Sequence, residues 1–337
     1  MKYLHWLAIA GITTTTLILD TPTSLAHISL NSQSDGIGTQ QLYYAYNRSL
    51  ELTEDLQRHE QNISCNDQSN RVNSVHPRIW LSRGIALQQQ QRYRQSLVCF
   101  DRALSLQPDL EQAWYRRGIS LSYLERYSQA IIAYQRAIEI DPKEHTSWYN
   151  QGNAYKHLQQ YNKAISAYER AIAIKNDFPA AYYQMGKVLE KIGSYERAIT
   201  FYQQAVEIDP EYHQALFSQA GLLNKLKSYQ KAIAVYQELI KLQPQQHEAW
   251  FNLGNIYLQL KEYHKAIAAY ERAIALKPDY ELAWNNRGAA LEALKQTKEA
   301  LRSYTQALQV NPNYEKALNN RRRLLLSLSN NTPSLYN

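Results

Sequence analysis

The sequence is poor in the residues that most enzyme and metal sites need. Its two cysteines, Cys65 and Cys99, lie too far apart to form the CxxC pair of a zinc knuckle. The nine histidines form no HExxH pattern, and Gly186-Lys187 lacks the glycine-rich lead-in of a phosphate loop. We therefore expect no catalytic residue, no metal and no cofactor, and we predict that the chain is not an enzyme.

Glycine, proline and blocks of like charge are also scarce. The chain has 11 glycines and 10 prolines in 337 residues, and 20% of its residues are charged, a composition that suits a helical soluble domain. The net charge of +7 is spread among acidic residues instead of being gathered in runs. Such a diffuse bias does not indicate a nucleic-acid partner, and we expect none.

Only one apolar stretch near the start of the chain resembles a targeting segment. Residues 6–19 are apolar, follow Lys2, and are shorter than the roughly 20 residues that a membrane span needs. Small residues at Ser24 and Ala26 fit a cleavage site, so residues 1–26 are predicted to be a signal peptide of an exported (periplasmic, lumenal or secreted) protein. The alternative is a membrane anchor formed by uncleaved residues 4–19. Only in that case do we expect a membrane as a partner.

What the sequence does contain is an unbroken repeat of 34 residues. It is marked by large side chains at one position: Trp80, Trp114, Trp148, Tyr182, Leu216, Trp250 and Trp284. Four residues later comes a small residue, and twenty residues later an aromatic one, as in Gly254 and Tyr270. Alanine recurs between and after them, as in Ala266 and Ala273, and most units close with a proline such as Pro278. A period of this length is typical of a solenoid of helical hairpins.

Each unit is predicted to be a helix, a tight turn and a second helix. In the copy from 244 to 280, Trp250, Gly254 and Tyr257 fall at helical spacing, and Tyr270 and Ala273 do so further on. The short polar segment 261–263 between them suits a connection between antiparallel helices. The closing proline disfavours helix in the residue before it, and so ends the second helix.

These residues resemble the tetratricopeptide repeat, a helical hairpin with Trp, Gly, Ala, aromatic, Ala and Pro in this order. Seven copies fill residues 77–314. The resemblance implies an all-α fold, a right-handed α-solenoid, or superhelix, of tandem helix-turn-helix hairpins. Some positions depart from the pattern: Asn176 replaces the closing proline, Ala220 the glycine, and Leu239 the second small residue. Polar residues also stand where the family usually has a leucine: Arg83, Arg117, Gln151, Gln219 and Arg287.

Two segments flank the repeats. Residues 27–76 are predicted to be a polar arm followed by a capping helix, and residues 315–337 a C-terminal capping helix and a tail. In the second segment we expect Ala317, Leu318, Leu324, Leu325 and Leu328 to cover repeat seven, with the basic run 321–323 facing solvent. The alternative for the basic run is a docking patch for an anionic partner.

The two cysteines have two interpretations. In an exported protein, the oxidising compartment permits a disulfide between Cys65 and Cys99. Otherwise Cys99 is a buried residue of the first repeat and Cys65 is incidental.

The resemblance also implies a function and a surface. In this family the first helices of successive repeats line a concave groove that grips peptides or partner proteins. We therefore expect a non-enzymatic scaffold that binds a protein or peptide. Two alternatives remain: a membrane-anchored assembly or secretion factor, and a targeting subunit for a separate enzyme such as a glycosyltransferase. The sequence does not indicate the oligomeric state.

By register, eleven residues are candidates for contact with that partner. The asparagines can satisfy a peptide backbone, and the lysines favour acidic ligands, whereas the aromatic residues and asparagines are also common folding positions in the family. The candidates are Tyr115, Tyr149, Asn150, Asn153, Lys156, Tyr183, Lys187, Phe217, Phe251, Asn252 and Asn255.

Overall fold

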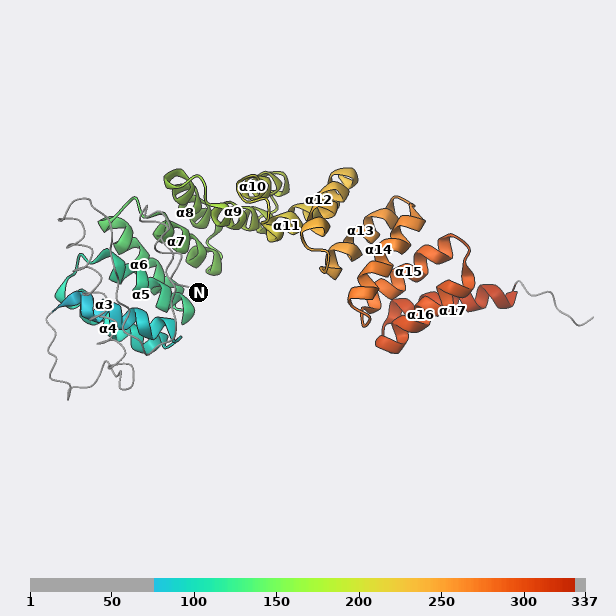
Figure 1. Ribbon diagram of the computed structural model, residues 1–337, viewed down its shortest axis with the longest axis horizontal. Coiled ribbons are helices and arrows are strands. Elements are labelled where there is room, and N and C mark those ends of the chain that lie inside the picture. The colour runs from blue at the N-terminus through green and yellow to red at the C-terminus, as the bar shows by residue number, and fades with distance from the viewer. Residues whose placement is uncertain (1–75, 331–337) are drawn as a thin grey trace, which may run out of the picture. The chain divides into compact units, whose positions relative to one another are not determined.

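The fold consists of α-helices that come in pairs of constant length (Figure 1). The computed structural model describes residues 76–330, and this range holds fifteen helices and no strand. The first helices of the seven pairs are α3 (Pro77–Gln89), α5 (Glu111–Tyr123), α7 (His145–His157), α9 (Pro179–Lys191), α11 (His213–Lys225), α13 (His247–Gln259) and α15 (Glu281–Ala293). The second helices are α4 (Tyr93–Leu106), α6 (Tyr127–Ile140), α8 (Tyr161–Ile174), α10 (Tyr195–Ile208), α12 (Tyr229–Leu242), α14 (Tyr263–Leu276) and α16 (Thr297–Val310).

Residues 1–75 lie outside the described residues. The expected signal peptide, the expected arm and its capping helix, and Cys65 therefore stay predictions. Cys99 is described: it is fully buried on α4 and is not a free thiol. Because Cys65 is not described, the pairing of the two cysteines also stays a prediction.

The turn within each pair reverses the chain over three residues, as the polar segment 261–263 predicted. α13 ends at Gln259, and Lys261 then adopts a left-handed backbone with a φ of 62°. The backbone N–H of Glu262 donates to the carbonyl of Tyr257 over 2.8 Å, which satisfies a carbonyl in the last turn of the helix. The equivalent left-handed residues of the other pairs are Gln91, Glu125, Gln159, Gly193, Lys227 and Lys295.

The spacing of glycine and aromatic residue that recurs in the repeats fixes how closely the two helices of a pair approach. A Cβ added at Gly254 would lie 2.7 Å from Cε1 of the Tyr270 ring, so only glycine lets the ring lie flat on the backbone of the first helix. The same contact joins Gly84, Gly118, Gly152, Gly186 and Gly288 to the aromatic residue of their own second helix. This aromatic residue is the largest fully buried side chain of each repeat.

Repeat five shows what happens without that glycine. Ala220 already carries a Cβ where the ring lies in the other repeats, and Gly221 is one residue too late to make room. The plane of Tyr236 meets that of Phe217 at 79°, whereas the equivalent angle between Tyr183 and Tyr202 is 40°. The packing of the aromatic pair in repeat five therefore differs from that in repeat four, which has the glycine.

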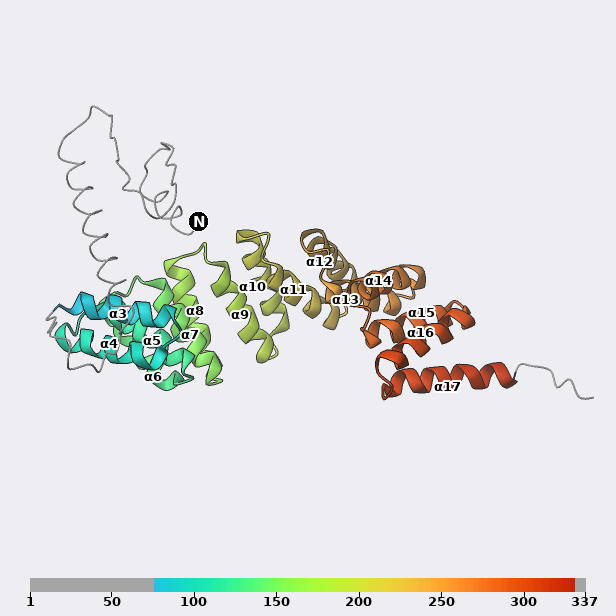
Figure 2. The same cartoon turned by 60° about the horizontal axis from the view of Figure 1, so that its bottom comes forward.

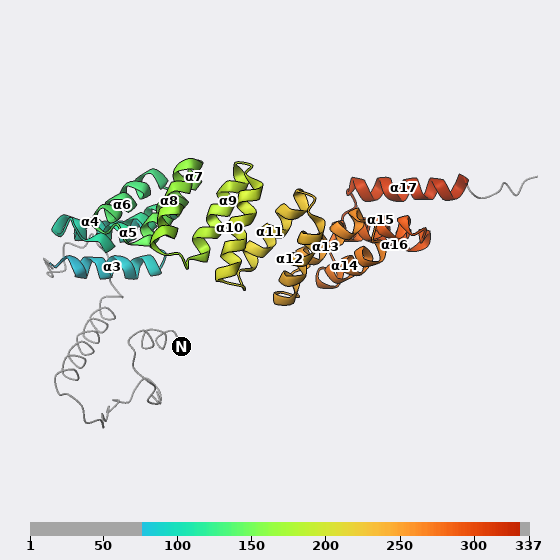
Figure 3. The ribbon, with the colours of Figure 1, turned by 90° about the horizontal axis from the view of Figure 1, so that it is seen from above.

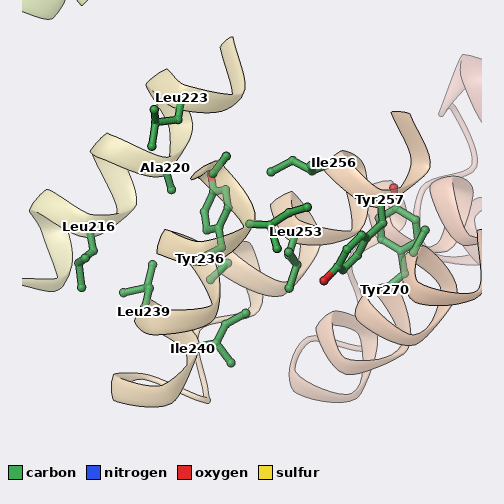
Figure 4. Close-up of a cluster of buried hydrophobic side chains, with 14 of the residues drawn as sticks. Leu216, Ala220, Leu223, Tyr236, Leu239, Ile240, Leu253, Ile256, Tyr257 and Tyr270 are labelled. Atoms are coloured by element: carbon green, nitrogen blue, oxygen red, sulfur yellow. The ribbon is translucent and has the colours of Figure 1, made fainter. Parts of the chain in front are cut away.

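Neighbouring pairs pack through small side chains, so that the last helix of one pair contacts the first helix of the next (Figure 2). Ala249 and Ala283, near the starts of first helices, and Ala266 and Ala273, on a second helix, are all fully buried. Small residues at these points let the helix backbones come close, and larger residues fill the space beside them. Figure 4 shows one such cluster, in which Leu216, Tyr236, Leu253 and Tyr270 from two successive pairs share one core.

Tryptophan and proline join the start of one repeat to the end of the previous one. The indole N–H of Trp250 donates to the carbonyl of Pro244 over 3.0 Å. Trp114, Trp148 and Trp284 make the same bond to the proline six residues before them. The two signature residues thus act together, and both serve the fold.

A last helix, α17 (Glu315–Asn330), follows the seventh pair and lies against α15 and α16 (Figure 3). Ala317 and Leu324 are buried there, as predicted. The expectation that Leu318, Leu325 and Leu328 also cover repeat seven was wrong, because they are 39%, 49% and 41% exposed. At 100° per residue Leu318 and Leu325 lie roughly 80–100° away from the side of Ala317 and Leu324. Leu328 shares that side, but it lies beyond the 13 residues that a first helix of the repeats spans.

Candidate binding surface

The predicted aromatic row follows the tryptophan position on successive first helices, and its rings are half-buried. Each ring contacts the buried aromatic residue of its own second helix, at centroid distances from 5.7 Å for Tyr183 with Tyr202 to 6.2 Å for Tyr115 with Tyr134. Tyr149, Phe217 and Phe251 make the same contact. Packing within the repeat therefore accounts for one face of each ring.

The predicted asparagines take part in hydrogen bonds inside the fold. Asn153 accepts a bond from the Tyr168 hydroxyl over 2.8 Å, and Asn255 accepts one from Tyr270 over 2.9 Å. Asn150 donates to the Tyr115 hydroxyl over 3.2 Å, which joins two successive first helices. Since the buried tyrosine hydroxyls need partners, these amides help to satisfy the core.

Asn252 of repeat six behaves in the same way toward Tyr236 of repeat five, where the pattern is otherwise disturbed. Burial raises the pKa of Tyr236 to about 12, and a hydrogen bond from Asn252 opposes that rise. An amide carries both donor and acceptor atoms, so one internal bond leaves capacity for a ligand. The asparagines can thus serve the fold and a ligand together.

A basic cluster lies on α7 and α9. Nζ of Lys156 donates to Oε1 of Gln184 over 2.6 Å, and Nζ of Lys187 lies 3.3 Å from Oε2 of Glu190. Burial lowers the pKa of Lys156, and the charge of nearby Lys187 lowers it further. Burial and the charge of Lys156 likewise lower the pKa of His157. The ammonium groups of Lys156 and Lys187, which belong to neighbouring repeats, therefore repel one another.

Two hollows hold most of the candidates from repeats two to five. The first has a volume of about 540 Å³ and is lined by Asn150, Asn153 and Lys156, together with Tyr123, Tyr127 and His157 at its edge. The second has a volume of about 520 Å³ and is lined by Tyr183, Lys187 and Phe217, with Glu190 and Lys225. Tyr115, Tyr149, Phe251, Asn252 and Asn255 line neither of these two hollows.

Neither a metal site nor a membrane span is found in the described residues. Within 76–330, no three His, Cys, Asp or Glu side chains come together in a way that could hold a metal ion. Over the same range, every helix is too short or too polar to cross a membrane.

Comparison with known protein families identifies the repeat. Models described as tetratricopeptide repeat match residues 77–110, 111–144, 133–166, 183–247, 247–280 and 282–314, and one described as TPR repeat matches 152–193. Together these matches cover more than half of the chain. The chain belongs to the tetratricopeptide repeat family.

Solved structures of tetratricopeptide repeat proteins share the fold. The C-terminal part of a TPR repeat-containing protein from Cytophaga hutchinsonii is 14% identical, with a TM-score of 0.65 over 71% of this chain and 98% of its own. A tetratricopeptide repeat protein from Parabacteroides merdae is 15% identical, with a TM-score of 0.51 over 74% and 98%. YrrB, described as a TPR protein with an unusual peptide-binding site, is 24% identical, with a TM-score of 0.49 over 58% and 97%. Among curated proteins, none matches the sequence.

The repeats also form a row of contacts that the sequence analysis missed. The first residue of a second helix meets the last residue of the next first helix, 30 positions later. Tyr93 stacks on Tyr123 at 4.4 Å, and Tyr127 on His157 at 4.5 Å. In later repeats, Lys225 donates to the Tyr195 hydroxyl over 2.7 Å, and the Tyr229 hydroxyl donates to Gln259 over 2.6 Å. The constant separation of 30 residues could have identified these pairs from the sequence. Each pair joins two repeats, however, so a single copy of the repeat does not contain it.

Proposed function

We propose that this tetratricopeptide repeat protein is a non-enzymatic scaffold that binds an extended acidic segment of a partner protein along α5, α7, α9 and α11. Membership of the family supports a role as an interaction scaffold, and the two hollows support the proposed position of the binding site. The observation that carries the proposal is that Lys156 and Lys187, on successive first helices, line the two hollows. Burial lowers the pKa of Lys156, and the charge of Lys187 lowers it further. A carboxylate of the partner between them would relieve this repulsion.

The hollows also favour an extended ligand over a compact one. The first is lined from α5, α6, α7 and α9, and the second mainly from α9 and α11, so that α9 contributes to both. A peptide that follows successive first helices can fill both hollows in turn. The aromatic edge of Tyr123 and Tyr127 offers apolar contact, and the amides of Asn150 and Asn153 offer bonds to a peptide backbone.

The test removes the two positive charges and compares the recovered partners. Lys156→Gln with Lys187→Gln is used as bait in a quantitative pull-down beside the wild type. Lys143→Gln with Lys316→Gln is the control, because both control lysines are exposed and lie outside the two hollows. We expect the first pair to lose partners that the wild type and the control retain. Equal recovery by a folded variant of the first pair would contradict the proposed site.

We also propose that the protein is exported and that residues 1–26 are removed. This rests on the apolar stretch 6–19 and the small residues before position 27. N-terminal sequencing of the protein purified from its natural source tests it. A mature chain beginning at His27 is the expected result, whereas a chain that begins at Met1 and fractionates with membranes would favour the anchored alternative.

A further inference from the structure

The last helix, α17, stands in the register of a first helix. Ala317 follows Ala283 by one full period, Leu318 follows Trp284, and Leu325 follows Leu291. Ala317 and Ala283 are both fully buried, so α17 packs on repeat seven as a first helix packs on the repeat before it. The register breaks at Arg322, which takes the place of the glycine that receives an aromatic ring in the other repeats.

The side of α17 where a second helix would pack is open to solvent. In the repeats the residue in the place of Leu325 packs against its own second helix, as Leu121 does beside Tyr134 and Leu291 beside Tyr304. Both leucines are at most 3% exposed, whereas Leu325 is 49% exposed. No described helix follows α17 to cover it.

This open side borders a space of about 690 Å³ that is lined by α17 alone. We call it the outer face of α17: Leu318, Arg321, Arg322, Leu325, Leu326 and Ser329. The only acidic residue of α17 is Glu315 in its first turn, and Arg323 bonds both carboxylate oxygens of Glu292 on α15. The outer face is therefore apolar and positively charged.

We propose that the outer face of α17 binds an acidic amphipathic helix of a partner protein, which occupies the place that a second helix takes in each repeat. Leu318 and Leu325 lie seven residues apart and therefore on one side of α17, where they can meet the apolar stripe of a facing helix. Arg322 keeps that helix further away than a glycine would. The residue opposite Arg322 is then an aspartate or glutamate that reaches the guanidinium group.

Charge argues for this occupant over two others. A second copy that paired through the same face would bring the arginines of both copies together without an acidic residue between them. A membrane-bound helix keeps its charges on the side away from the lipid, whereas Arg322 lies between Leu318 and Leu326, four residues from each, within the apolar side of α17. This surface is separate from the two hollows, so its test is independent of the proposed function.

The experiment measures binding of designed helices to the full chain by fluorescence anisotropy. The probe is a lactam-stapled peptide based on α16, which packs in the second-helix position of repeat seven. Tyr304, the residue that meets the glycine in that repeat, is changed to glutamate together with Lys298 and Arg302. A second, basic probe has lysine at all three positions. Stapling is needed because a helix of 14 residues is marginal in water. The protein variants are Leu325→Glu, Arg321→Gln with Arg322→Gln, and, as a charge control, Lys316→Gln.

We expect the acidic probe to bind and the basic probe not to bind. Leu325→Glu and the double arginine variant should each weaken the acidic probe about tenfold or more, with no change for Lys316→Gln. Circular dichroism must show unchanged helix content, which is expected because Leu325 is exposed. Equal binding of both probes, or unchanged binding by Leu325→Glu, would overturn the proposal.

Two further outcomes would assign the face to another occupant and also overturn the proposal. One is a doubling of mass in solution that Leu325→Glu abolishes, which indicates a second copy. The other is binding to phosphatidylglycerol vesicles, lost in Leu325→Glu, without binding of the acidic probe. A last experiment deletes residues 331–337. If the acidic probe binds only after that deletion, those residues are the occupant of the outer face and the proposal is overturned.

Discussion

Two helical glycines in neighbouring repeats have opposite surroundings. A Cβ at Gly254 would meet the Tyr270 ring at 2.7 Å, whereas one at Gly221 would meet nothing closer than the Tyr236 hydroxyl at 3.9 Å. Glycine at the first position is required by packing, and at the second it only costs helix propensity. The same residue type therefore stabilises one repeat and weakens the next.

Substitution of these two glycines by alanine should change stability in opposite directions. We expect Gly254→Ala to destabilise the protein by about 1–3 kcal/mol, since the buried ring must move. Gly221→Ala should be neutral or stabilise it by up to about 1 kcal/mol. Thermal unfolding followed by circular dichroism gives both values. A similar loss in the two variants would show that the ring contact is not the cause.

The lowered pKa of Lys156 predicts a dependence of stability on pH. Its folded pKa lies below the unfolded value, so the folded state binds fewer protons in the interval between the two. The stability of the wild type relative to Lys156→Gln should thus rise as the pH increases through the lowered pKa toward about 10.5, and fall again on acidification. Unfolding in urea across this range measures the difference. If the difference in unfolding free energy between wild type and Lys156→Gln does not change with pH, the prediction is refuted. Lys143→Gln provides the reference for loss of an exposed charge.

At the scale of the helix, the joint between α8 and α9 is the one that lacks its proline. Lys175, the residue before Asn176, already has φ of −132° and ψ of 100°. Gln107, which precedes Pro108, has nearly the same values of −140° and 92°. The backbone at this joint is therefore extended, as a residue before proline requires.

Asn176→Pro should consequently stabilise the protein by about 0.4–1 kcal/mol, because proline restricts the unfolded chain without disturbing the folded one. Lys175→Pro is the matched control. It should destabilise, since the Lys175 N–H donates to the carbonyl of Ala171 over 3.0 Å. Melting temperatures of the two variants test the pair, and a stabilising Lys175→Pro would rule out this account.

At the scale of the whole chain, each repeat contacts its neighbours and few residues beyond them. Stability in such an array is close to a sum of repeat and interface terms. A defect in one repeat should therefore remain local.

Hydrogen exchange can show this locality. In Gly254→Ala, faster exchange is expected in α13 and α14 and to a lesser degree in α12 and α15, with no change in α3 to α6. Mass spectrometry of proteolytic fragments resolves these segments. Uniform acceleration over all the helices would mean that the array unfolds as one unit.

The sequence predicted those structural features that recur with the 34-residue repeat, and it did not predict those that depend on contacts between different repeats. The hairpins, their turns and the glycine contact recur every 34 residues, so one good copy such as 244–280 was enough. The environment of Lys156 depends on Gln184 and Lys187 in the next repeat, which no single copy shows. The open face of α17 was mispredicted because periodicity identifies apolar residues but not which of them have a neighbour.

Because the contacts between successive repeats are alike, they affect how the length of such a chain can change during evolution. Ala249 and Ala283, one period apart, meet the preceding repeat in the same buried way. Loss or duplication of one whole unit of 34 residues therefore creates a junction much like those already present, whereas any other length puts a large residue where a small one is required. Genes for such chains can therefore grow and shrink by whole units, and each unit gained adds one more pair of helices to the row.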